Sequence, residues 1–378
     1  MGRLIRAALL SAPDAPFEMC SAELANPRPE EVVVRIAACG VCHTDAEART
    51  LVPTPSVLGH EGAGIVELVG SEVRDFRAGD RVVMSYPSCG RCERCSKGRP
   101  FHCESGIDLS FGGHRADGSM PITLDGNPLA SAFFQQSAFA DYALVPSRSL
   151  VRIPDHIDAP WSILAALPCG ILTGAGAVLE AFGAGPADSI AVFGAGAVGL
   201  AAVMAASMVG VSHIIAVDVA ADRLSLALEL GAHQALDANE GSVAARIRET
   251  TPSGVRYALD TAGRGDTWRD AVESLGIGGQ FGIVTEIPAF PFRPEELFLK
   301  AGSLRSILLG EAVPSVLIPK LLEWRAAGRF PVDRLVTAFP FERINDAFAS
   351  SAAGQAIKPV LEMPGTATFR NHPQEFPS

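Results

Sequence analysis

The sequence predicts a two-domain α/β protein, with a β-rich domain and a doubly wound domain built on a parallel sheet. The first observation is length, because 378 residues exceed what one compact core usually holds. The second is a change of pattern, from short strands before residue 150 to strands alternating with helices after residue 170. The third is a glycine-rich turn at 194–199, between an apolar strand and a helix.

Short apolar runs bounded by turn residues predict the strands of the first domain. They lie at 4–10, 32–38, 63–69, 81–84 and 139–145. The segment 111–128 is dominated by Gly, Asp, Ser and Pro, so we expect an exposed loop there.

The second domain is predicted from strands that alternate with helical patterns, which is typical of a parallel sheet. The expected strands are 190–193, 214–217, 257–260 and 280–284, and the expected helices are 197–208, 221–230, 243–250 and 267–275. After residue 308 we expect helices at 316–327 and 341–350 and a strand at 357–361. Residues 364–378 lack periodicity and are expected to form a loose tail.

Composition excludes several classes of function. Apolar residues make up 48% and charged residues 19%, as in packed soluble proteins, and the net charge of −11 disfavours nucleic-acid and anionic-membrane partners. The longest apolar run, 189–219, is interrupted by glycines and fits strand, turn, helix and strand better than a membrane span. Eight cysteines without a signal-peptide pattern at the N-terminus predict a reducing, cytoplasmic setting in which clustered thiols bind metal.

Four cysteines with short spacings form the first chemical motif: Cys89, Cys92, Cys95 and Cys103. Four thiolates can enclose one tetrahedral ion, which is typical of structural zinc. An iron–sulfur cluster is the alternative, but the interval of seven residues before Cys103 does not match the ferredoxin pattern.

The second motif is Gly194-Ala195-Gly196-Ala197-Val198-Gly199, which follows a strand and opens a helix. Such glycines allow a tight turn, close approach of a pyrophosphate and packing of helix on strand. Asp218 follows Gly199 by nineteen residues at the end of the next strand, where a carboxylate accepts from the adenosine ribose. It would repel a 2′-phosphate, so NAD is favoured over NADP; a merely glycine-rich turn is the alternative.

The third set is dispersed and consists of Cys42, His60, Glu61 and Cys169. By type these residues can bind metal, but a lone Cys in an apolar run is usually a small core residue and a lone His can be a satisfied core side chain. Spacing alone does not unite them.

Taken together, these segments resemble the zinc-dependent medium-chain alcohol dehydrogenases, from about residue 5 to 362. The matching stretches are Gly40–Asp45, Gly59–Gly62, the four-cysteine cluster, Cys169-Gly170 with Thr173-Gly174, and Gly194–Gly199. The resemblance implies a GroES-like β-rich catalytic domain at 1–173 and 308–378, and a Rossmann NAD-binding domain at 174–307.

The resemblance also implies roles for individual residues. Cys42, His60 and Cys169 match the catalytic zinc ligands, Glu61 a carboxylate that approaches the metal transiently, and Asp45 the acid that orients the histidine ligand. Thr44 matches the hydroxyl that passes the proton on. Many relatives carry a histidine at the end of this relay, whereas this chain has Glu47, which we expect to serve as the distal base unless protons leave by another route. Two zinc ions per chain follow.

Cofactor and substrate contacts are implied in the same way. His43 and Lys358 match contacts to the cofactor pyrophosphate, Arg223 a residue beside the ribose, and Thr173 a contact on the nicotinamide side. The run 133–140 and the sequence after Cys169 resemble the aryl-alcohol (benzyl-alcohol) branch, whose relatives oxidise allylic terpenols. Ser85-Tyr86 falls at the substrate pocket, where Ser85 replaces a large aromatic residue of ethanol-preferring relatives and should admit a bulkier alcohol.

The sequence therefore predicts NAD-dependent oxidation of a primary aromatic or allylic alcohol by a homodimer or homotetramer. A thiol-dependent formaldehyde dehydrogenase of the same superfamily is the nearest alternative. A zinc-finger nucleic-acid binder is disfavoured by the acidic charge, and a non-catalytic homologue by the presence of all three expected zinc ligands. The run 133–139 either lines the pocket or fills the core.

Overall fold

The computed structural model describes residues 2–285 and 293–365. These residues form two compact units. The first comprises the described chain up to Cys169, Val313–Glu323 and the described chain from Asp333; the second comprises the described part of Gly170–Ala312 and Trp324–Val332. The expected boundaries were at 173/174 and 307/308. The expected tail, 364–378, falls almost entirely outside the described residues.

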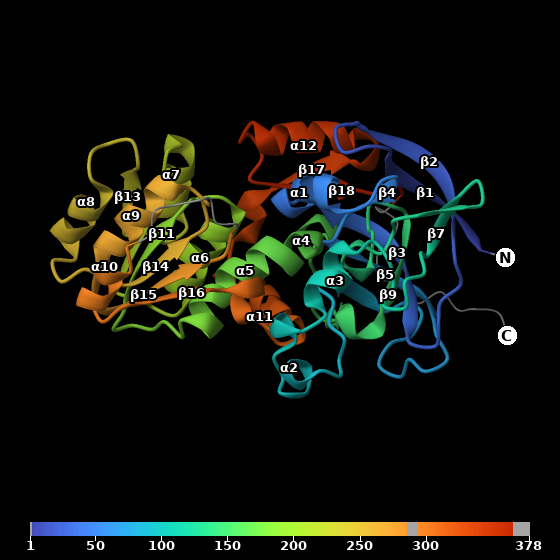
Figure 1. The fold of residues 1–378 in the computed structure, drawn as a ribbon, viewed down its shortest axis with the longest axis horizontal. Helices are drawn as coiled ribbons and strands as arrows, with labels where there is room; N and C mark the ends of the chain where they lie inside the picture. The colour runs from blue at the N-terminus through green and yellow to red at the C-terminus, as the bar shows by residue number, and fades with distance from the viewer. Residues whose placement is uncertain (1, 286–292, 366–378) are drawn as a thin grey trace. The chain divides into compact units, whose positions relative to one another are not determined.

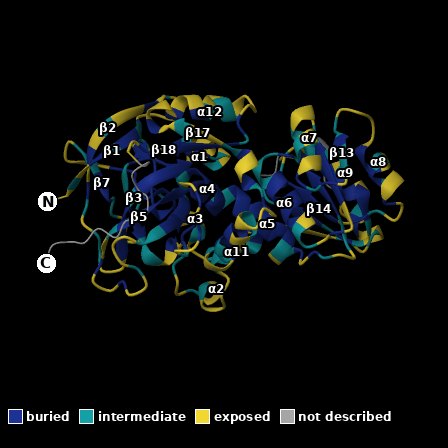
Figure 2. Cartoon of the chain, turned by 180° about the vertical axis from the view of Figure 1, so that it is seen from behind, coloured by how far each residue is buried: buried dark blue, intermediate teal, exposed yellow. Residues whose placement is uncertain are grey.

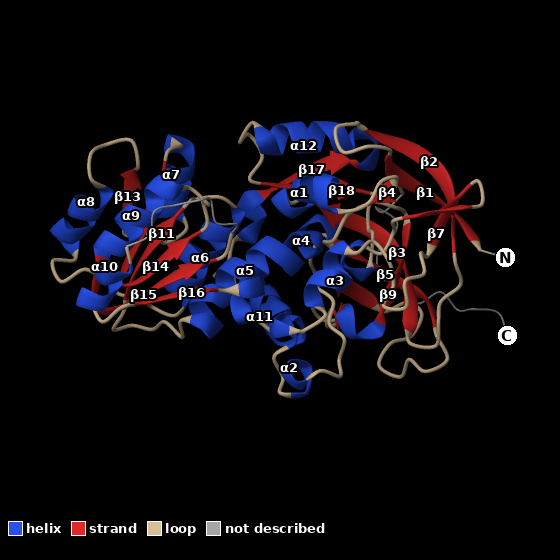
Figure 3. Ribbon diagram, in the orientation of Figure 1, coloured by secondary structure: helices blue, strands red, loops and turns tan. Residues whose placement is uncertain are grey.

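Two sheets make up the β-rich first unit (Figures 1 and 3). One has the order β4-β1-β2-β7-β8, and the other β10-β6-β5-β3-β18-β17 with β9 paired to β3. The strands are β1 (Arg3–Leu10), β2 (Phe17–Leu24), β3 (Glu31–Gly40), β4 (Ser56–Val57), β5 (Gly62–Val69), β6 (Arg81–Met84), β7 (Ile122–Leu124), β8 (Asn127–Leu129), β9 (Tyr142–Pro146), β10 (Leu150–Arg152), β17 (Val336–Pro340) and β18 (Lys358–Glu362).

Strand β3 is the centre of the larger sheet. Its sequence, EVVVRIAACG, buries every residue except Arg35, as expected for a β-branched strand covered on both faces. Strand β18 pairs antiparallel with the end of β3, so that Val360 lies opposite Gly40. The end of the described chain thus returns to the strand that leads into Cys42. The helices of this unit are α1 (His43–Leu51), α2 (Glu93–Ser96), α3 (Gly106–Phe111), α4 (Trp161–Ala166) and α12 (Ile344–Ala352), and α11 (Pro314–Ala326) begins in it.

The second unit has a parallel sheet with the order β13-β12-β11-β14-β15-β16. The order reverses at β11, which makes the sheet doubly wound and places a ligand crevice at the carboxyl ends of β11 and β14. The strands are β11 (Ser189–Phe193), β12 (His213–Asp218), β13 (Gln234–Asp237), β14 (Val255–Asp260), β15 (Leu275–Ile283) and β16 (Ser303–Ser306). The helices are α5 (Leu172–Gly176), α6 (Ala197–Met208), α7 (Ala221–Glu229), α8 (Val243–Thr250), α9 (Gly265–Ser274) and α10 (Pro294–Leu299). The predicted fold class is confirmed.

The chain contains two long apolar stretches, and only one of them has the structure that the sequence predicts. The run 189–219 is strand, turn, helix and strand, as expected. A second apolar stretch, Trp161–Ala181, forms one continuous helical segment that the sequence pattern does not indicate. It is long and apolar enough to cross a membrane, but 83% of its most apolar window is buried in protein, as in a core helix. Figure 2 shows the same burial along α4 and α5.

The expectation of an exposed loop at 111–128 is wrong in part. This segment contains β7 and the start of β8, which pair as a hairpin. It also contains Arg115, which is 7% exposed and donates to both carboxylate oxygens of Glu31 at 2.7 and 3.0 Å. Short strands and a buried ion pair leave no periodic signal among so many turn residues, so sequence patterning could not find them.

Candidate active site

The first expected metal ligand, Cys42, lies where β3 gives way to α1. The carboxylate of Asp45, one turn into the helix, accepts from the Cys42 amide at 3.0 Å and so caps the helix start. Gly40 is required because a Cβ there would lie 1.9 Å from Glu61 Oε2 and 2.9 Å from the Ala165 carbonyl oxygen. The missing side chain lets the Cys42 turn and the Glu61 turn approach each other.

Asp45 also orients His60. Its Oδ1 lies 2.9 Å from His60 Nδ1 and accepts from the Gly59 amide at 3.2 Å. With Asp45 as acceptor, the Nδ1 proton is fixed and the lone pair is on Nε2. That Nε2 is buried and has no hydrogen-bond partner among the described residues. A buried imidazole nitrogen aimed at two sulfur atoms is the arrangement a metal ion would satisfy.

Cys169 completes the group from a π-helical turn, Leu167–Ile171, inside the long apolar helix. Its Sγ lies 4.0 Å from Cys42 Sγ. One ligand atom from each of Cys42, His60, Glu61 and Cys169 lies within 4.8 Å of all the others. Two sulfur atoms, one imidazole and a nearby carboxylate fit a zinc ion with one position left open.

Burial shapes the electrostatics of this cluster. The pKa of the Cys42 thiol lies well below its ordinary value, because Cys169 donates to its sulfur and His60 and Lys358 are close, while the same pairing and burial raise the pKa of Cys169. Burial raises the pKa of Glu61 to about 7, although the Lys358 charge opposes this rise.

Lys358 differs from the expectation of a pyrophosphate contact. It is 2% exposed, forms an ion pair with Glu61, and lies 3.4 Å from the Val41 carbonyl oxygen. This placement makes it the partner of the buried Glu61 carboxylate, because an unpaired charge at that depth would be costly.

The four-cysteine cluster occupies the loop around α2. One sulfur from each cysteine lies within 4.8 Å of the other three, and all four residues are half-buried. Backbone amides point at the sulfurs: Cys89 donates to Cys103 Sγ at 3.1 Å, and Cys92 donates to Cys89 Sγ at 3.3 Å. Amides from Glu104 and Cys95 lower the pKa of Cys92 to about 6. These sulfurs fit a closed structural zinc site.

The glycine-rich turn has the features of a phosphate cradle. A Cβ at Gly199 would lie 1.8 Å from the Gly194 carbonyl oxygen, so this glycine lets α6 pack against the turn. A Cβ at Gly196 would meet no described atom within 4 Å, and this residue caps α6. The open side of Gly196 and the free amides at the helix start fit a dinucleotide pyrophosphate.

Asp218 ends β12 beside this turn. Its Oδ2 accepts from the Ala195 amide at 2.6 Å, and its Oδ1 accepts from the amides of Val219 and Ala220 at 2.8 and 2.9 Å. The carboxylate is half-buried and adjoins the glycine-rich turn, where it can meet an adenosine ribose. Arg223 lies on α7 and is half-buried, and Thr173 lies on α5 and is 7% exposed.

The remaining expected residues divide between the surface and the core. His43 and Glu47 are exposed on α1, and the Thr44 hydroxyl lies 3.7 Å from Cys42 Sγ. Ser85 and Tyr86 are 1% and 6% exposed. The Ser85 hydroxyl donates to the Pro168 carbonyl oxygen at 3.0 Å, and its place in the substrate pocket stays a prediction.

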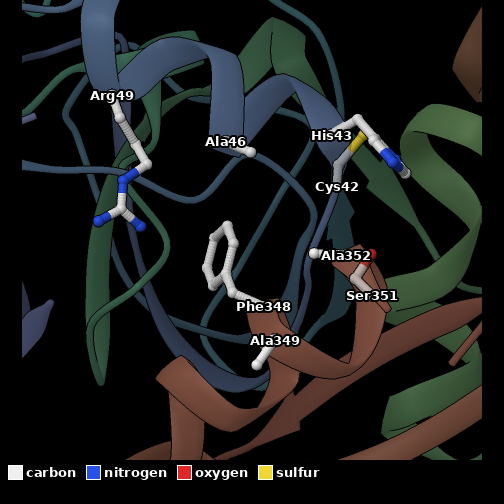
Figure 4. Close-up of a pocket in the computed structure, with 8 residues that line it drawn as sticks. All are labelled: Cys42, His43, Ala46, Arg49, Phe348, Ala349, Ser351 and Ala352. Carbon is white, nitrogen blue, oxygen red and sulfur yellow. The ribbon is translucent and has the colours of Figure 1, made fainter. Parts of the chain in front are cut away.

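A pocket of about 310 Å³ opens between α1 and α12 (Figure 4). It is lined by Cys42, His43, Ala46, Arg49, Phe348, Ala349, Ser351 and Ala352. The sequence analysis missed Arg49 and Phe348, which lie within 6.0 Å as a cation over a ring. No motif contains them, and only the packing of α12 beside α1 brings them together.

Comparison with known proteins identifies the family. The alcohol dehydrogenase GroES-like domain model matches residues 28–155, and the zinc-binding dehydrogenase model matches residues 197–326. A geraniol dehydrogenase of Castellaniella defragrans is 42% identical, over 94% of this chain and 97% of that protein.

Two solved structures share the whole architecture. A zinc-binding domain alcohol dehydrogenase protein from Burkholderia ambifaria has a TM-score of 0.93 at 43% identity, covering 96% of this chain and 100% of that one. The benzyl alcohol dehydrogenase of Acinetobacter calcoaceticus has a TM-score of 0.91 at 36% identity, covering 96% and 99%. The chain therefore belongs to the zinc-dependent medium-chain alcohol dehydrogenases and is an alcohol dehydrogenase.

Proposed function

We propose that this enzyme uses NAD to oxidise a primary aromatic or allylic alcohol reversibly to the aldehyde. The main support for this substrate class is the 42% identity to a geraniol dehydrogenase over nearly the whole chain. Similarity to a benzyl alcohol dehydrogenase along 96% of the chain supports the same class, because both names denote alcohols whose hydroxyl carbon adjoins an unsaturated carbon.

In this proposal Cys42, His60 and Cys169 hold the catalytic zinc, and Cys89, Cys92, Cys95 and Cys103 hold a structural one. Bound by these residues, zinc would supply a Lewis acid that lowers the pKa of an alcohol oxygen, and NAD would supply the hydride acceptor. Asp45 keeps His60 in the tautomer that presents Nε2. Thr44, beside Cys42, takes up the alcohol proton, and exposed Glu47 passes it to solvent.

NAD preference is assigned to Asp218, with Gly194, Gly196 and Gly199 cradling the pyrophosphate and Arg223, Thr173 and His43 as further contacts. A carboxylate at the ribose end of β12 accepts from a 2′-hydroxyl and repels a 2′-phosphate. Asp218→Ala should therefore lower the ratio of kcat/KM with NAD to kcat/KM with NADP by at least about tenfold. Asp237→Ala, at the end of the neighbouring β13, is the matched control and should leave the ratio unchanged.

A substrate panel tests the alcohol class. We expect kcat/KM with NAD to be higher for benzyl, cinnamyl and prenyl-type allylic alcohols than for ethanol or the S-hydroxymethyl adduct of a thiol. A preference for the thiol adduct would replace the proposal with formaldehyde oxidation, and a preference for ethanol would reject the bulky-alcohol assignment.

We further propose a homodimer or homotetramer that works in the reducing cytoplasm. The parallel sheet ends in the edge strand β16, and apolar side chains are exposed nearby: Ile277 at 79%, Phe298 at 83% and Leu299 at 76%. Exposed apolar clusters next to an open sheet edge favour self-association. Phe298→Asp should reduce the molar mass measured by light scattering, and an unchanged mass would place the interface elsewhere. None of the eight cysteines forms a disulfide, which fits a reducing compartment.

A further inference from the structure

The segment 133–139 carries an unusual concentration of backbone strain. Phe134, Gln135 and Ser137 have φ values of 50°, 55° and 47°. Side chains other than glycine rarely adopt this left-handed region, at a cost of about 1 kcal/mol or more each. Such strain persists only where surrounding contacts impose it. The contacts of this segment therefore indicate its role.

The segment packs directly against His60. The His60 ring lies 4.6 Å from the Phe134 ring and 5.5 Å from the Phe133 ring, centroid to centroid. Phe133 is fully buried and Phe134 is 7% exposed. Together with Asp45 on Nδ1, these rings limit the imidazole to one orientation.

Gln136 holds the backbone around the same histidine. Its amide nitrogen donates to the His60 carbonyl oxygen at 2.8 Å, and its amide oxygen accepts from the Gly62 amide at 3.2 Å. The second hydrogen of that nitrogen points to the Ser85 carbonyl oxygen at 3.4 Å. Gln136 is 2% exposed, so these protein groups replace the water it would otherwise bind.

Ser85 continues this connection towards the other end of the metal site. Its hydroxyl donates at 3.0 Å to the carbonyl oxygen of Pro168, the residue before Cys169. The accepting carbonyl belongs to the π-helical turn Leu167–Ile171. A path of hydrogen bonds and one residue's backbone therefore joins the chain at His60 to the chain at Cys169.

We propose that Gln136 and Ser85 form a brace that sets the spacing of His60 and Cys169 and thereby positions these two side chains to hold the catalytic zinc. Both act as positioning residues, since neither touches a reacting atom. The inference rests on the proposed assignment of Cys42, His60 and Cys169 as zinc ligands. It gives Ser85 a structural task beside the pocket-lining one predicted from the sequence.

The neighbouring Gln135 provides an internal comparison. It is also buried, at 6% exposure, but its amide donates to the carbonyl oxygens of Leu109 and His114, in and beside α3. The two glutamines thus have the same chemistry, nearly the same depth and adjacent positions. Only Gln136 contacts the backbone of a predicted zinc ligand.

The test uses the zinc-loaded full chain and measures zinc release to a chromogenic chelator, with the four-cysteine zinc as an internal reference. The variants are Gln136→Met, Ser85→Ala, their double mutant, and Gln135→Met as the control. Loss of groups that support metal ligands typically lowers metal affinity about 10- to 100-fold. We expect Gln136→Met and Ser85→Ala each to release one of the two zinc ions about tenfold faster, with the second ion unaffected.

Coupling distinguishes a brace from two unrelated packing defects. If Gln136 and Ser85 act through one path, the double mutant should release zinc little faster than the worse single mutant. Replacing the catalytic zinc with Co²⁺ gives a second readout, because its visible absorption reports ligand geometry. The Co²⁺ band should shift in Gln136→Met and Ser85→Ala and stay in place in Gln135→Met.

Three outcomes overturn the brace: zinc release within twofold of wild type in both single variants, equal acceleration in Gln135→Met, or additive effects in the double mutant. Ser85→Ala removes only one hydroxyl, so it keeps the test open if Gln136→Met does not fold. A Cys42→Ala variant that retains both zinc ions would instead reject the proposed metal site itself.

Discussion

The two residue clusters that could hold a metal ion are built at very different ranges of sequence. Fifteen residues contain all four cysteines of the Cys89–Cys103 cluster, whereas Cys42 and Cys169 of the other cluster are 127 residues apart. Backbone amides of its own loop surround the first cluster. The second is buried and depends on Asp45, Lys358, Gln136 and the glycine at position 40, contributed by separate segments.

The comparison indicates that one loop with the right cysteine spacing can supply a closed structural site. An open catalytic site needs contacts from many parts of a domain to fix its ligands. Four thiolates in a short loop can organise themselves around an ion. Three ligands with a free position must be fixed by protein contacts, since a nearby carboxylate such as Glu61 could otherwise fill that position.

The largest expected effect comes from Cys42→Ala. We expect one of two zinc ions to be lost and kcat/KM to fall by on the order of a thousandfold or more, because the alcohol oxygen is no longer polarised. Metal analysis and steady-state rates measure both. Cys20→Ala, at a half-buried thiol on β2, is the control and should retain two ions and full activity. Full activity in Cys42→Ala would remove the functional distinction between the clusters.

Lys358→Met tests whether burial governs the catalytic cluster. Removing one partner of a buried ion pair costs about 3–5 kcal/mol of unfolding free energy, because the other charge is left without compensation. The double mutant Glu61→Gln with Lys358→Met should recover most of that loss. Urea unfolding of the zinc-loaded protein measures each value.

Arg343→Met breaks the exposed pair with Asp346 and is the matched control for Lys358→Met. Its partners are 63% and 55% exposed, so the expected loss is below about 1 kcal/mol. Equal losses in Lys358→Met and Arg343→Met would contradict the claim that the catalytic cluster relies on a buried counter-charge.

Cys95→Ala should separate stability from catalysis. With three thiolates left, the closed site should lose its zinc and the melting temperature should fall by about 2–3 °C, the shift that roughly 2 kcal/mol produces in a chain of 378 residues. We expect kcat/KM at low temperature to stay within about threefold of wild type. Calorimetry and rates on one preparation give both values, and a collapse of activity in protein that remains folded would link the two clusters.

The smallest effect is expected for Glu47→Gln. Glu47 is exposed on α1, where water can partly replace a proton acceptor. A fall in kcat of about threefold, with an altered pH–rate profile, would fit the end of a proton path. Glu72→Gln, at another exposed acid, should change neither. If the two variants behave alike, the proton leaves without Glu47.

The fold and the local motifs were readable from the sequence, because each depends on spacing within a short window. Alternating strands and helices, the glycine-rich turn and the four cysteines are of this kind. The dispersed site emerged only from resemblance to a family, since no periodicity connects Cys42 with His60 or Cys169.

Contacts set by tertiary packing could not be predicted. The ion pair of Lys358 with Glu61 and the hydrogen bond from Ser85 to Pro168 join residues far apart in the sequence, and no local pattern indicates either contact. The helix Trp161–Ala181 was missed because an apolar segment buried on all sides shows no amphipathic period.

The pairing of β18 with the end of β3 has a consequence for biosynthesis. The buried lysine that neutralises Glu61 is the first residue of β18, so it leaves the ribosome long after Cys42, His60 and Cys169. At typical rates of translation this delay is on the order of ten seconds or more. The four-cysteine loop can capture zinc during that interval, while the catalytic site reaches its final charge balance only after β18 has been translated. A ribosome-bound chain ending before β18 should therefore carry one tightly held zinc ion, and the full chain two.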